Sequence, residues 1–198
     1  MKSVLIFPIK SYSERVQGKN FRIINSAPLY KHFPMICKIS GMFDKIAIDT
    51  DSSEIRDWAK KIGFDTLTRV ESLASNDANG NDLLRHHRTI YSEYDFLWQG
   101  FVTTPLISVE TVVNMVNFLK DCHKPDSRGL FWDSIMTCRK LKGFFWTPDG
   151  LPLYHRPDVM PRSQDLAPIF QERHGLFGIT RKAFDITRTR AGVKPYPY

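Results

Sequence analysis

Cysteine is scarce in this chain, and its scarcity argues against two common kinds of site. The sequence has three cysteines in 198 residues, Cys37, Cys122 and Cys138, and none of them belongs to a C-x-x-C pair. An odd number of scattered cysteines without a secretion signal is typical of reduced thiols rather than of a disulfide framework. Cysteine-ligated zinc is disfavoured as well, because such sites take their ligands from closely spaced pairs.

Long apolar runs are also missing. No run approaches the roughly 18 residues that a membrane span requires. The first apolar run, residues 4–7, ends at Pro8, whereas the apolar part of a signal peptide needs roughly 7–15 residues. We therefore interpret residues 3–7 as a first buried strand, and we expect a cytoplasmic protein with no membrane partner.

The chain has no basic tail and no run of five like charges, although its formal net charge is +7. A positive net charge favours an anionic partner, either nucleic acid or a nucleotide together with an acidic sugar. Single-stranded nucleic acid binds where aromatic side chains alternate with basic ones, but the aromatics here lie mostly within apolar runs. We therefore expect no nucleic-acid partner. Charge alone is equally compatible with a mildly basic protein that binds no anion.

Short apolar runs alternate with stretches of helical character along the whole chain. Strands are expected at residues 3–7, 45–50, 65–70, 95–101, 133–141 and 176–180. Helices are expected at residues 27–40, 52–63, 79–94, 108–122 and 181–187. Strands separated by helices predict βαβ units, and so an α/β fold with a mostly parallel, doubly wound sheet. A chain of this length is expected to form a single domain over residues 1–198.

Residues 141–172 break this rhythm. The segment carries five prolines and several aromatic residues. It is expected to form an extended excursion with hairpin character. So long an irregular segment within a domain is usually functional or part of an interface.

The loop after the first strand is the leading candidate for a binding site, because ligands of open α/β sheets bind beyond the carboxyl ends of the strands. This loop carries three cations, two hydroxyls and one glycine: Lys10, Arg15, Lys19, Ser11, Ser13 and Gly18. Backbone N–H groups and cations held in place can cradle a polyphosphate. The Walker A spacing G-x-x-x-x-G-K-[ST] is absent. The residue types by themselves leave two interpretations open, a polyphosphate site and a solvated basic loop.

The same loop resembles a known signature. Residues 7–20 read FPIKSYSERVQGKN, and they resemble the N-terminal motif of the sugar-nucleotide cytidylyltransferases, roughly I-P-A-R-x-x-S-x-R-x-x-x-K-N. That family includes the acylneuraminate (CMP-sialic acid synthetase) and keto-deoxy-octulosonate enzymes. Lys10 stands where the family has arginine. The matching positions are Pro8, Ser13, Arg15, Lys19 and Asn20.

Further segments resemble the family in the same order along the chain. They lie at residues 25–30, 45–63, 69–84, 103–108 and 162–179, and together they cover most of the sequence. The Q-D-L element at residues 164–166 is similar to the acylneuraminate branch. The resemblance implies a nucleotide-diphospho-sugar transferase type of sheet. It also implies that residues 141–172 form a protruding segment that builds a homodimer and lines the sugar site.

The resemblance implies a transferase that joins CTP to an acidic sugar, such as a nonulosonic acid, and releases pyrophosphate. Charge develops on the phosphorus oxygens and on the departing pyrophosphate, so catalysis needs cations in fixed places. Lys19 is implied at the α-phosphate and Arg15 on the β/γ side, with Lys10 as the third catalytic cation. Pro8, Ser13 and Asn20 are implied in nucleotide binding, although a loop cap is the alternative role for Asn20.

A second group of nucleotide-binding residues is implied further along the chain. Arg69 is expected near the base, and a surface arginine is the alternative. Asn79, Gly80 and Asn81 are expected to approach the ribose or base. They are equally suited to a turn and a helix N-cap together with Asp82.

Four other positions outside residues 141–172 are considered for a role in the site. Thr103 is expected to contact the nucleotide. Asp51 is either a helix cap or a site residue, and the cap is slightly favoured. His86 and His87 lack a metal-binding spacing and are expected to be surface or packing residues.

The sugar site is implied within residues 141–172. Arg162, Gln164 and Asp165 are the candidate sugar-binding residues. The planar guanidinium of Arg162 matches a sugar carboxylate in a bidentate arrangement, and a salt bridge at a subunit interface is the alternative.

The reaction of the family needs Mg²⁺, which carboxylates and phosphate oxygens hold, and we expect this cofactor. Its protein ligands are unknown here. Thr103 or Thr104 stands where the octulosonate branch has a metal-binding aspartate. The acidic pair of the acylneuraminate branch follows a K-P-Y-x-Y stretch, at which this sequence stops. We therefore expect either a truncated chain or a homologue without the usual metal site.

Two points leave the function open at this stage. The glutamine that contacts the base in the family is replaced by Phe101, with Gln99 two residues away, so the preference for CTP over other nucleotides is not settled by the motif. The absence of the acidic pair favours an alternative function, a nucleotide- or sugar-binding homologue with impaired catalysis.

Overall fold

The computed structural model describes residues 1–74 and 78–198. Within this part of the chain, seven strands form one sheet in the order β5-β4-β1-β6-β8-β7-β9. The strands are β1 (Ser3–Ile9), β4 (Lys45–Thr50), β5 (Asp65–Thr68), β6 (Phe96–Gly100), β7 (Ser134–Leu141), β8 (Ile169–Thr180) and β9 (Pro195–Pro197). All neighbours are parallel except β6–β8 and β8–β7. The expected mostly parallel sheet is confirmed.

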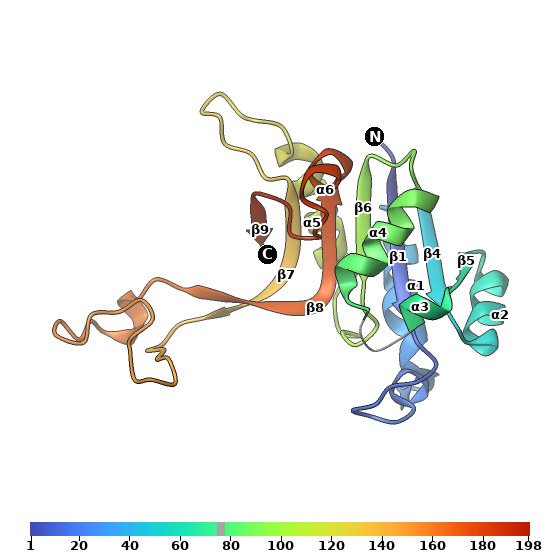
Figure 1. Ribbon diagram of the computed structural model, residues 1–198, viewed down its shortest axis with the longest axis horizontal. Helices are drawn as coiled ribbons and strands as arrows, with labels where there is room; N and C mark the ends of the chain where they lie inside the picture. The colour runs from blue at the N-terminus through green and yellow to red at the C-terminus, as the bar shows by residue number, and fades with distance from the viewer. Residues whose placement is uncertain (75–77) are drawn as a thin grey trace.

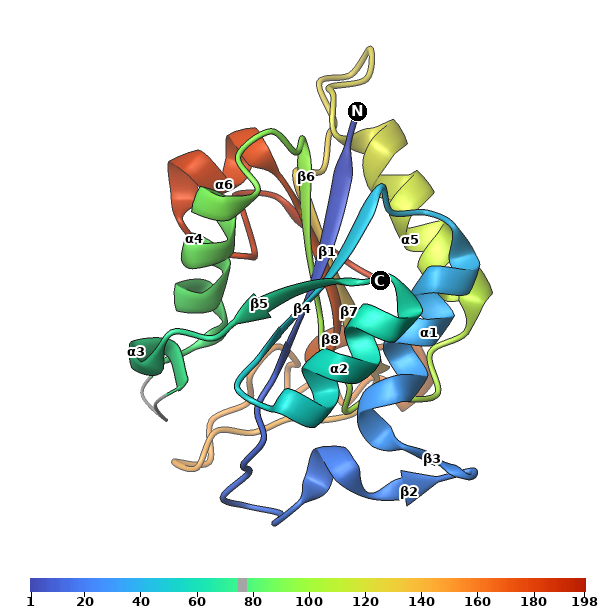
Figure 2. The ribbon, with the colours of Figure 1, turned by 90° about the vertical axis from the view of Figure 1, so that its right-hand side faces the viewer.

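Helices cover both faces of this sheet. They are α1 (Leu29–Ser40), α2 (Ser53–Ile62), α3 (Glu71–Ala74), α4 (Gly80–Ile90), α5 (Val109–Cys122) and α6 (Arg181–Thr187). Figure 2 shows α4 and α6 on one face and α1, α2 and α5 on the other. This two-sided cover is the doubly wound arrangement expected from the sequence. No helix in the described residues is long and apolar enough to cross a membrane.

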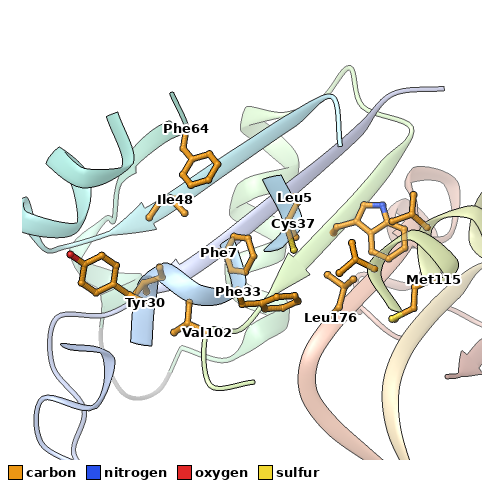
Figure 3. Packing of buried hydrophobic residues seen from close by; sticks show 14 of the residues in the cluster. Leu5, Phe7, Tyr30, Phe33, Cys37, Ile48, Phe64, Val102, Met115 and Leu176 are labelled. Atoms are coloured by element: carbon orange, nitrogen blue, oxygen red, sulfur yellow. The ribbon is translucent and has the colours of Figure 1, made fainter. Parts of the chain in front are cut away.

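The two cores follow from the alternation of side chains along β1. Val4 and Ile6 pack into the cluster under α4 and α6. Leu5 and Phe7 point to the opposite face, where Phe7 meets Phe33 of α1 edge to face at 5.4 Å between ring centroids. Figure 3 shows this second cluster. The uninterrupted apolar run of residues 4–7 in β1 is therefore explained by burial on both faces.

Helix ends are set by local side chains. Ser52 caps α2 by accepting a hydrogen bond from the N–H of Ile55 at 3.3 Å, and Gly63 ends that helix with a φ of 84°. Pro34 lies inside α1 and does not end it. A proline there removes one backbone hydrogen bond, but Phe33 and Cys37 are fully buried in the core, and this packing holds the helix together.

Residues 141–172, called the arm below, project away from the sheet on the side opposite to α2 (Figure 1). The expected hairpin is present: the N–H of Leu153 donates to the carbonyl of Phe145 at 2.9 Å, and that of Thr147 to Leu151 at 2.8 Å. The strand expected at residues 176–180 is longer than predicted. It begins at Ile169, which pairs with Leu141, so β7 and β8 form a two-stranded stem for the arm.

Two shorter elements frame the first loop. The turn Lys19–Phe21 is a 3₁₀ helix, labelled η1. It is followed by a small antiparallel hairpin of β2 (Ile23–Ile24) and β3 (Ala27–Pro28), which leads directly into α1. The loop after β1 is thus tied at its far end to a helix that packs on the core.

Candidate active site

A pocket of about 330 Å³ opens beyond the carboxyl ends of β1, β5 and β6. The residues that line it are Pro8, Lys10, Tyr12, Ser13, Glu14, Arg15, Lys19, Asn20, Arg69, Leu83, Phe101, Val102 and Thr103. All three cations of the first loop face this pocket together. The prediction of a site at this edge of the sheet therefore coincides with the pocket.

The loop of residues 8–20 is anchored at both ends. Ser11 donates its N–H to Oδ1 of Asp51 at 2.7 Å and its Oγ to Oδ2 of Asp51 at 2.6 Å. At the other end, Nδ2 of Asn20 donates to the carbonyl oxygen of Lys10 at 2.8 Å. Gly18 precedes η1 and has a φ of 63°, a backbone conformation that favours glycine. The cations are consequently carried by a closed loop.

Asp51 is not the cap of α2, so the slightly favoured interpretation is wrong. Ser52 occupies the cap position, and Asp51 instead anchors the loop through Ser11. Burial alone would raise the pKa of the Asp51 carboxyl. The hydrogen bonds from Ser11 outweigh that effect and lower the pKa. A carboxylate that stays ionised keeps the loop attached across the neutral pH range.

Lys19 and Arg15 lie close enough to affect each other. The pKa of Lys19 is lowered, first because partial burial disfavours the charged ammonium and second because Arg15 repels it. Two cations that repel each other in one pocket wall are stabilised when an anion binds between them. The pocket wall is therefore electrostatically suited to a polyanion.

Of the other residues predicted for nucleotide binding, five line the pocket: Pro8, Ser13, Asn20, Arg69 and Thr103. Asn20 is buried, and its Oδ1 has no hydrogen-bond partner among the described residues. Nδ2 of Asn20 therefore holds the loop through the carbonyl of Lys10. Its Oδ1 is an acceptor that no described residue uses. The two roles proposed for Asn20 are compatible.

Asn79, Gly80 and Asn81 do not line the pocket. Oδ1 of Asn79 accepts from the N–H of Asn81 at 2.8 Å and of Asp82 at 3.2 Å, and Oδ2 of Asp82 accepts from the N–H of Asn79 at 3.0 Å. This reciprocal capping box is the structural alternative named for these residues. Gly80 does make a close approach, but to Arg190: a Cβ there would lie 2.5 Å from Nη1.

Arg162, Gln164 and Asp165 lie on the arm and are not among the residues that line the pocket of their own chain. Nε of Arg162 donates to Oδ2 of Asp165 at 2.7 Å, and Nζ of Lys142 donates to the carbonyl of Gln164 at 2.7 Å. Both side chains of the Arg162–Asp165 pair are largely exposed. A sugar-binding role for these residues stays a prediction.

Arg69 is the charged residue that lines the pocket from outside the first loop. It follows β5, and its side chain is buried against Asp49 of β4. His87 of α4 contacts the same carboxylate, with Nε2 2.9 Å from Oδ2 of Asp49. His87 is expected from the sequence to be a surface or packing residue. It is fully buried, so it is a packing residue. Sequence reasoning missed its link to the pocket.

Sequence reasoning also missed Leu83, Tyr12 and Glu14 as lining residues. Leu83 belongs to the apolar stripe of α4, and nothing in that stripe distinguishes a core position from a pocket wall. Tyr12 and Glu14 could have been inferred, because both lie between the predicted cations Lys10 and Arg15 in the same loop. Together with Phe101 and Val102, Leu83 adds apolar side chains to the pocket lining from outside the first loop.

The expected Mg²⁺ does not find a complete set of protein ligands. In residues 1–74 and 78–198, no three His, Cys, Asp or Glu side chains are grouped in a way that holds a metal ion. Glu14 supplies the one carboxylate among the lining residues, while Asp49 and Asp51 are engaged by Arg69, His87 and Ser11.

Comparison with known proteins agrees with this fold. The sequence profile of the cytidylyltransferase family matches residues 4–180. An N-acylneuraminate cytidylyltransferase of Streptococcus agalactiae is 30% identical over 96% of this chain and 48% of its own length. The pseudaminic acid cytidylyltransferase of Campylobacter jejuni is 23% identical over 93% of this chain and 81% of its own length.

Among solved structures, a CMP:2-keto-3-deoxy-manno-octonic acid synthetase complexed with CTP superposes with a TM-score of 0.66 at 17% identity, over 93% of this chain and 76% of that one. At this identity the likeness shows a shared fold. The chain spans about half or less of the curated N-acylneuraminate cytidylyltransferases that it matches. A family profile that covers nearly the whole sequence is sufficient for one conclusion: the chain belongs to the cytidylyltransferase family.

Proposed function

We propose that this chain carries the nucleotide-binding pocket of a cytidylyltransferase that activates an acidic sugar with CTP, releasing pyrophosphate and forming a CMP-sugar. The observation that supports this most directly is the set of three cations, Lys10, Arg15 and Lys19, facing one pocket at the carboxyl edge of the sheet. Family membership makes CTP the nucleotide to test first. The relatives act on acidic sugars by name, so the sugar substrate is proposed from the same class.

The pocket suggests how the nucleotide lies. The cations of the first loop would take the triphosphate. Arg69, Leu83, Phe101 and Val102 line the pocket from outside that loop, and we propose that this part of the lining, called the base end below, takes the flat base. This orientation leaves the α-phosphorus near the middle of the pocket, where a sugar hydroxyl can attack it from the open side.

The chemistry then requires charge stabilisation rather than a covalent intermediate. The anomeric hydroxyl forms a bond to the α-phosphorus and loses its proton, while the bond to the β-phosphate oxygen breaks and pyrophosphate departs. Negative charge increases on the non-bridging oxygens and on the leaving group, and fixed cations stabilise it. We propose Lys19 at the α-phosphate and Arg15 and Lys10 along the departing phosphates.

The sugar site is proposed to include the arm of a second copy. Several large apolar side chains of the arm are exposed, among them Leu151, Leu153 and Met160 at 57–65%. An exposed group of this kind usually marks an interface. In a homodimer, Arg162 of the arm would be free to meet the carboxylate of the sugar in the neighbouring pocket, with Gln164 and Asp165 beside it.

Mg²⁺ dependence is also part of the proposal. CTP phosphate oxygens can supply most of the ligands that this cation needs, so the nucleotide would bring the ion with it. Removing Mg²⁺ with a chelator is expected to abolish pyrophosphate release and to leave the melting temperature of the protein unchanged. A chelator-resistant turnover would contradict this part of the proposal.

A binding homologue without turnover is the second candidate. The incomplete set of metal ligands in the described residues is the observation that favours it. Pyrophosphate release separates the two. With CTP and N-acetylneuraminic, pseudaminic, legionaminic or keto-deoxy-octulosonic acid, the enzyme releases pyrophosphate with at least one sugar, whereas a binding homologue binds CTP in calorimetry and releases none. Equal or absent binding of CTP and ATP would overturn both.

A further inference from the structure

Arg69 is held in the pocket wall by an unusually complete set of contacts. Its Nε lies 3.3 and 3.2 Å from the two carboxylate oxygens of Asp49, and its Nη2 donates to the backbone carbonyl of Asp49 at 2.8 Å. The two side chains are 1% and 2% exposed. Asp49 therefore holds the Nε–Nη2 edge of the guanidinium, and the Nη1 side lies outside this contact.

His87 fixes the carboxylate that fixes Arg69. Its Nε2 is 2.9 Å from Oδ2 of Asp49, and its Nδ1 is buried with no hydrogen-bond partner in the described part of the chain. An ionised carboxylate accepts only, so Nε2 must carry the proton and donate it to Asp49. Nδ1 is then the bare nitrogen of a neutral ring, because a proton there would be a buried donor without an acceptor.

The charges of the three residues form a balanced set. Burial alone would raise the pKa of Asp49, but the hydrogen bond from His87 and the charge of Arg69 lower it. Burial lowers the pKa of His87, against the opposing effect of Asp49. The set is thus one anion, one cation and one neutral ring. A buried ion pair of this kind is weak support for stability, which raises the question of what it contributes to the pocket.

We infer that Asp49 and His87 are positioning residues, which hold the guanidinium of Arg69 in the one orientation where it meets the base of the bound nucleotide. The inference rests on the proposed function, because it takes Arg69 as part of the base end. A guanidinium only donates hydrogen bonds. Cytosine offers it two neighbouring acceptors, O2 and N3, whereas N3 of uracil carries a proton. An oriented Arg69 therefore favours CTP over UTP, and a loosely held one loses this selectivity.

The choice of variants follows from the geometry. His87→Leu keeps the bulk of the side chain and removes the donor to Asp49. His87→Gln places an amide donor near the position of Nε2 and is the conservative rescue. His86→Leu is the matched control, since His86 is the neighbouring histidine on α4 and lies outside the pocket lining.

The ligands also separate positioning from a general loss of structure. CTP and UTP report on the base end, and inorganic triphosphate reports on the loop of residues 8–20 alone. His87→Leu is expected to weaken CTP binding about tenfold, the scale for losing one hydrogen bond to a charged group, and to lower the CTP-to-UTP ratio by the same factor. Triphosphate affinity should stay within twofold, and His87→Gln and His86→Leu should behave as the wild type.

A double-mutant cycle tests whether the effect passes through Arg69. Lysine retains the charge but cannot form the Nε–Nη2 contact, so in an Arg69→Lys background His87→Leu should weaken CTP binding less than twofold further. A nucleotide-free readout accompanies it: the ¹⁵Nε–¹H signal of Arg69 should be resolved in wild-type protein and broadened in His87→Leu.

The results distinguish this inference from the proposed function. An unchanged CTP affinity in His87→Leu overturns the inference, and so does an equal loss of triphosphate and CTP affinity. If wild-type protein binds CTP no better than triphosphate, the proposed nucleotide selectivity fails. In that case the Arg69 signal still decides: if it is unchanged in His87→Leu, the positioning role is overturned too.

Discussion

Ser11 donates two hydrogen bonds to the carboxylate of Asp51, from its N–H to Oδ1 at 2.7 Å and from its Oγ to Oδ2 at 2.6 Å. The two residues are 40 positions apart, at the ends of neighbouring parallel strands β1 and β4. The first loop is thereby attached to the turn that begins α2. Asp51 thus holds the loop that carries the cations, although it is not itself among the residues that line the pocket.

Asp51→Ala should loosen this attachment and weaken CTP binding. The loss of two hydrogen bonds to a carboxylate at the surface is expected to lower CTP affinity about three- to tenfold, because the loop must then be ordered by the ligand. Isothermal calorimetry measures it. Asp57→Ala, on the exposed side of α2, is the control and should bind as the wild type; equal affinities for all three proteins would show that the anchor does not matter.

The buried pair of His87 and Asp49 predicts how stability depends on pH. The pKa of His87 is lowered below its usual value of 6.5 in the folded state. At a pH between the folded-state pKa and 6.5, the unfolded chain therefore binds more protons than the folded one. The free energy of unfolding falls as the pH drops below about 6.5, by at most about 1.4 kcal/mol per pH unit. The pKa of Asp49 is also lowered, and its contribution is lost only at more acidic pH, below about 3.8.

Urea unfolding of wild type and His87→Gln at pH 7.5 and 5.5 checks this dependence. Glutamine does not titrate, so the variant should lose less stability than the wild type between the two pH values. The difference isolates His87 from the other histidines. A parallel loss of stability in both proteins would contradict the assignment of a neutral, buried His87.

The arm provides a prediction about assembly. The wild-type protein is expected to be a homodimer in light scattering, and the double substitution Leu153→Lys and Met160→Lys should make it a monomer, because it places two charges on the apolar face of the arm. Ile39→Lys and Ile186→Lys change equally exposed apolar residues elsewhere and should leave a dimer. A monomeric wild type at concentrations used for calorimetry would refute the prediction.

What the sequence could predict was mostly local. The cations Lys10, Arg15 and Lys19 stand within one loop, so their convergence on one pocket follows once the first strand is recognised. The two-faced burial of β1 could likewise be read from an uninterrupted apolar run. The mostly parallel order of the sheet follows from the alternation of strands and helices.

The remainder depends on tertiary geometry. His87 and Asp49 are 38 positions apart, and their contact depends on the rotation of α4 about its axis, which no local pattern specifies. Asp51 was ambiguous because Ser52 beside it is an equally good cap. Asn79, Gly80 and Asn81 suited both a ligand and a helix start, and the structure shows the helix start.

The turnover of Lys19→Ala is the most direct test of the catalytic role proposed for the first loop. The cations of the first loop are proposed to stabilise charge that develops in the transition state. Such an interaction affects turnover more than binding. With CTP and an acidic sugar that the wild type uses, turnover should fall by roughly two to three orders of magnitude, while CTP affinity falls far less and Lys60→Ala, on the exposed face of α2, is unaffected. Unchanged turnover in Lys19→Ala, or a large loss of CTP affinity with turnover intact at saturation, would contradict it.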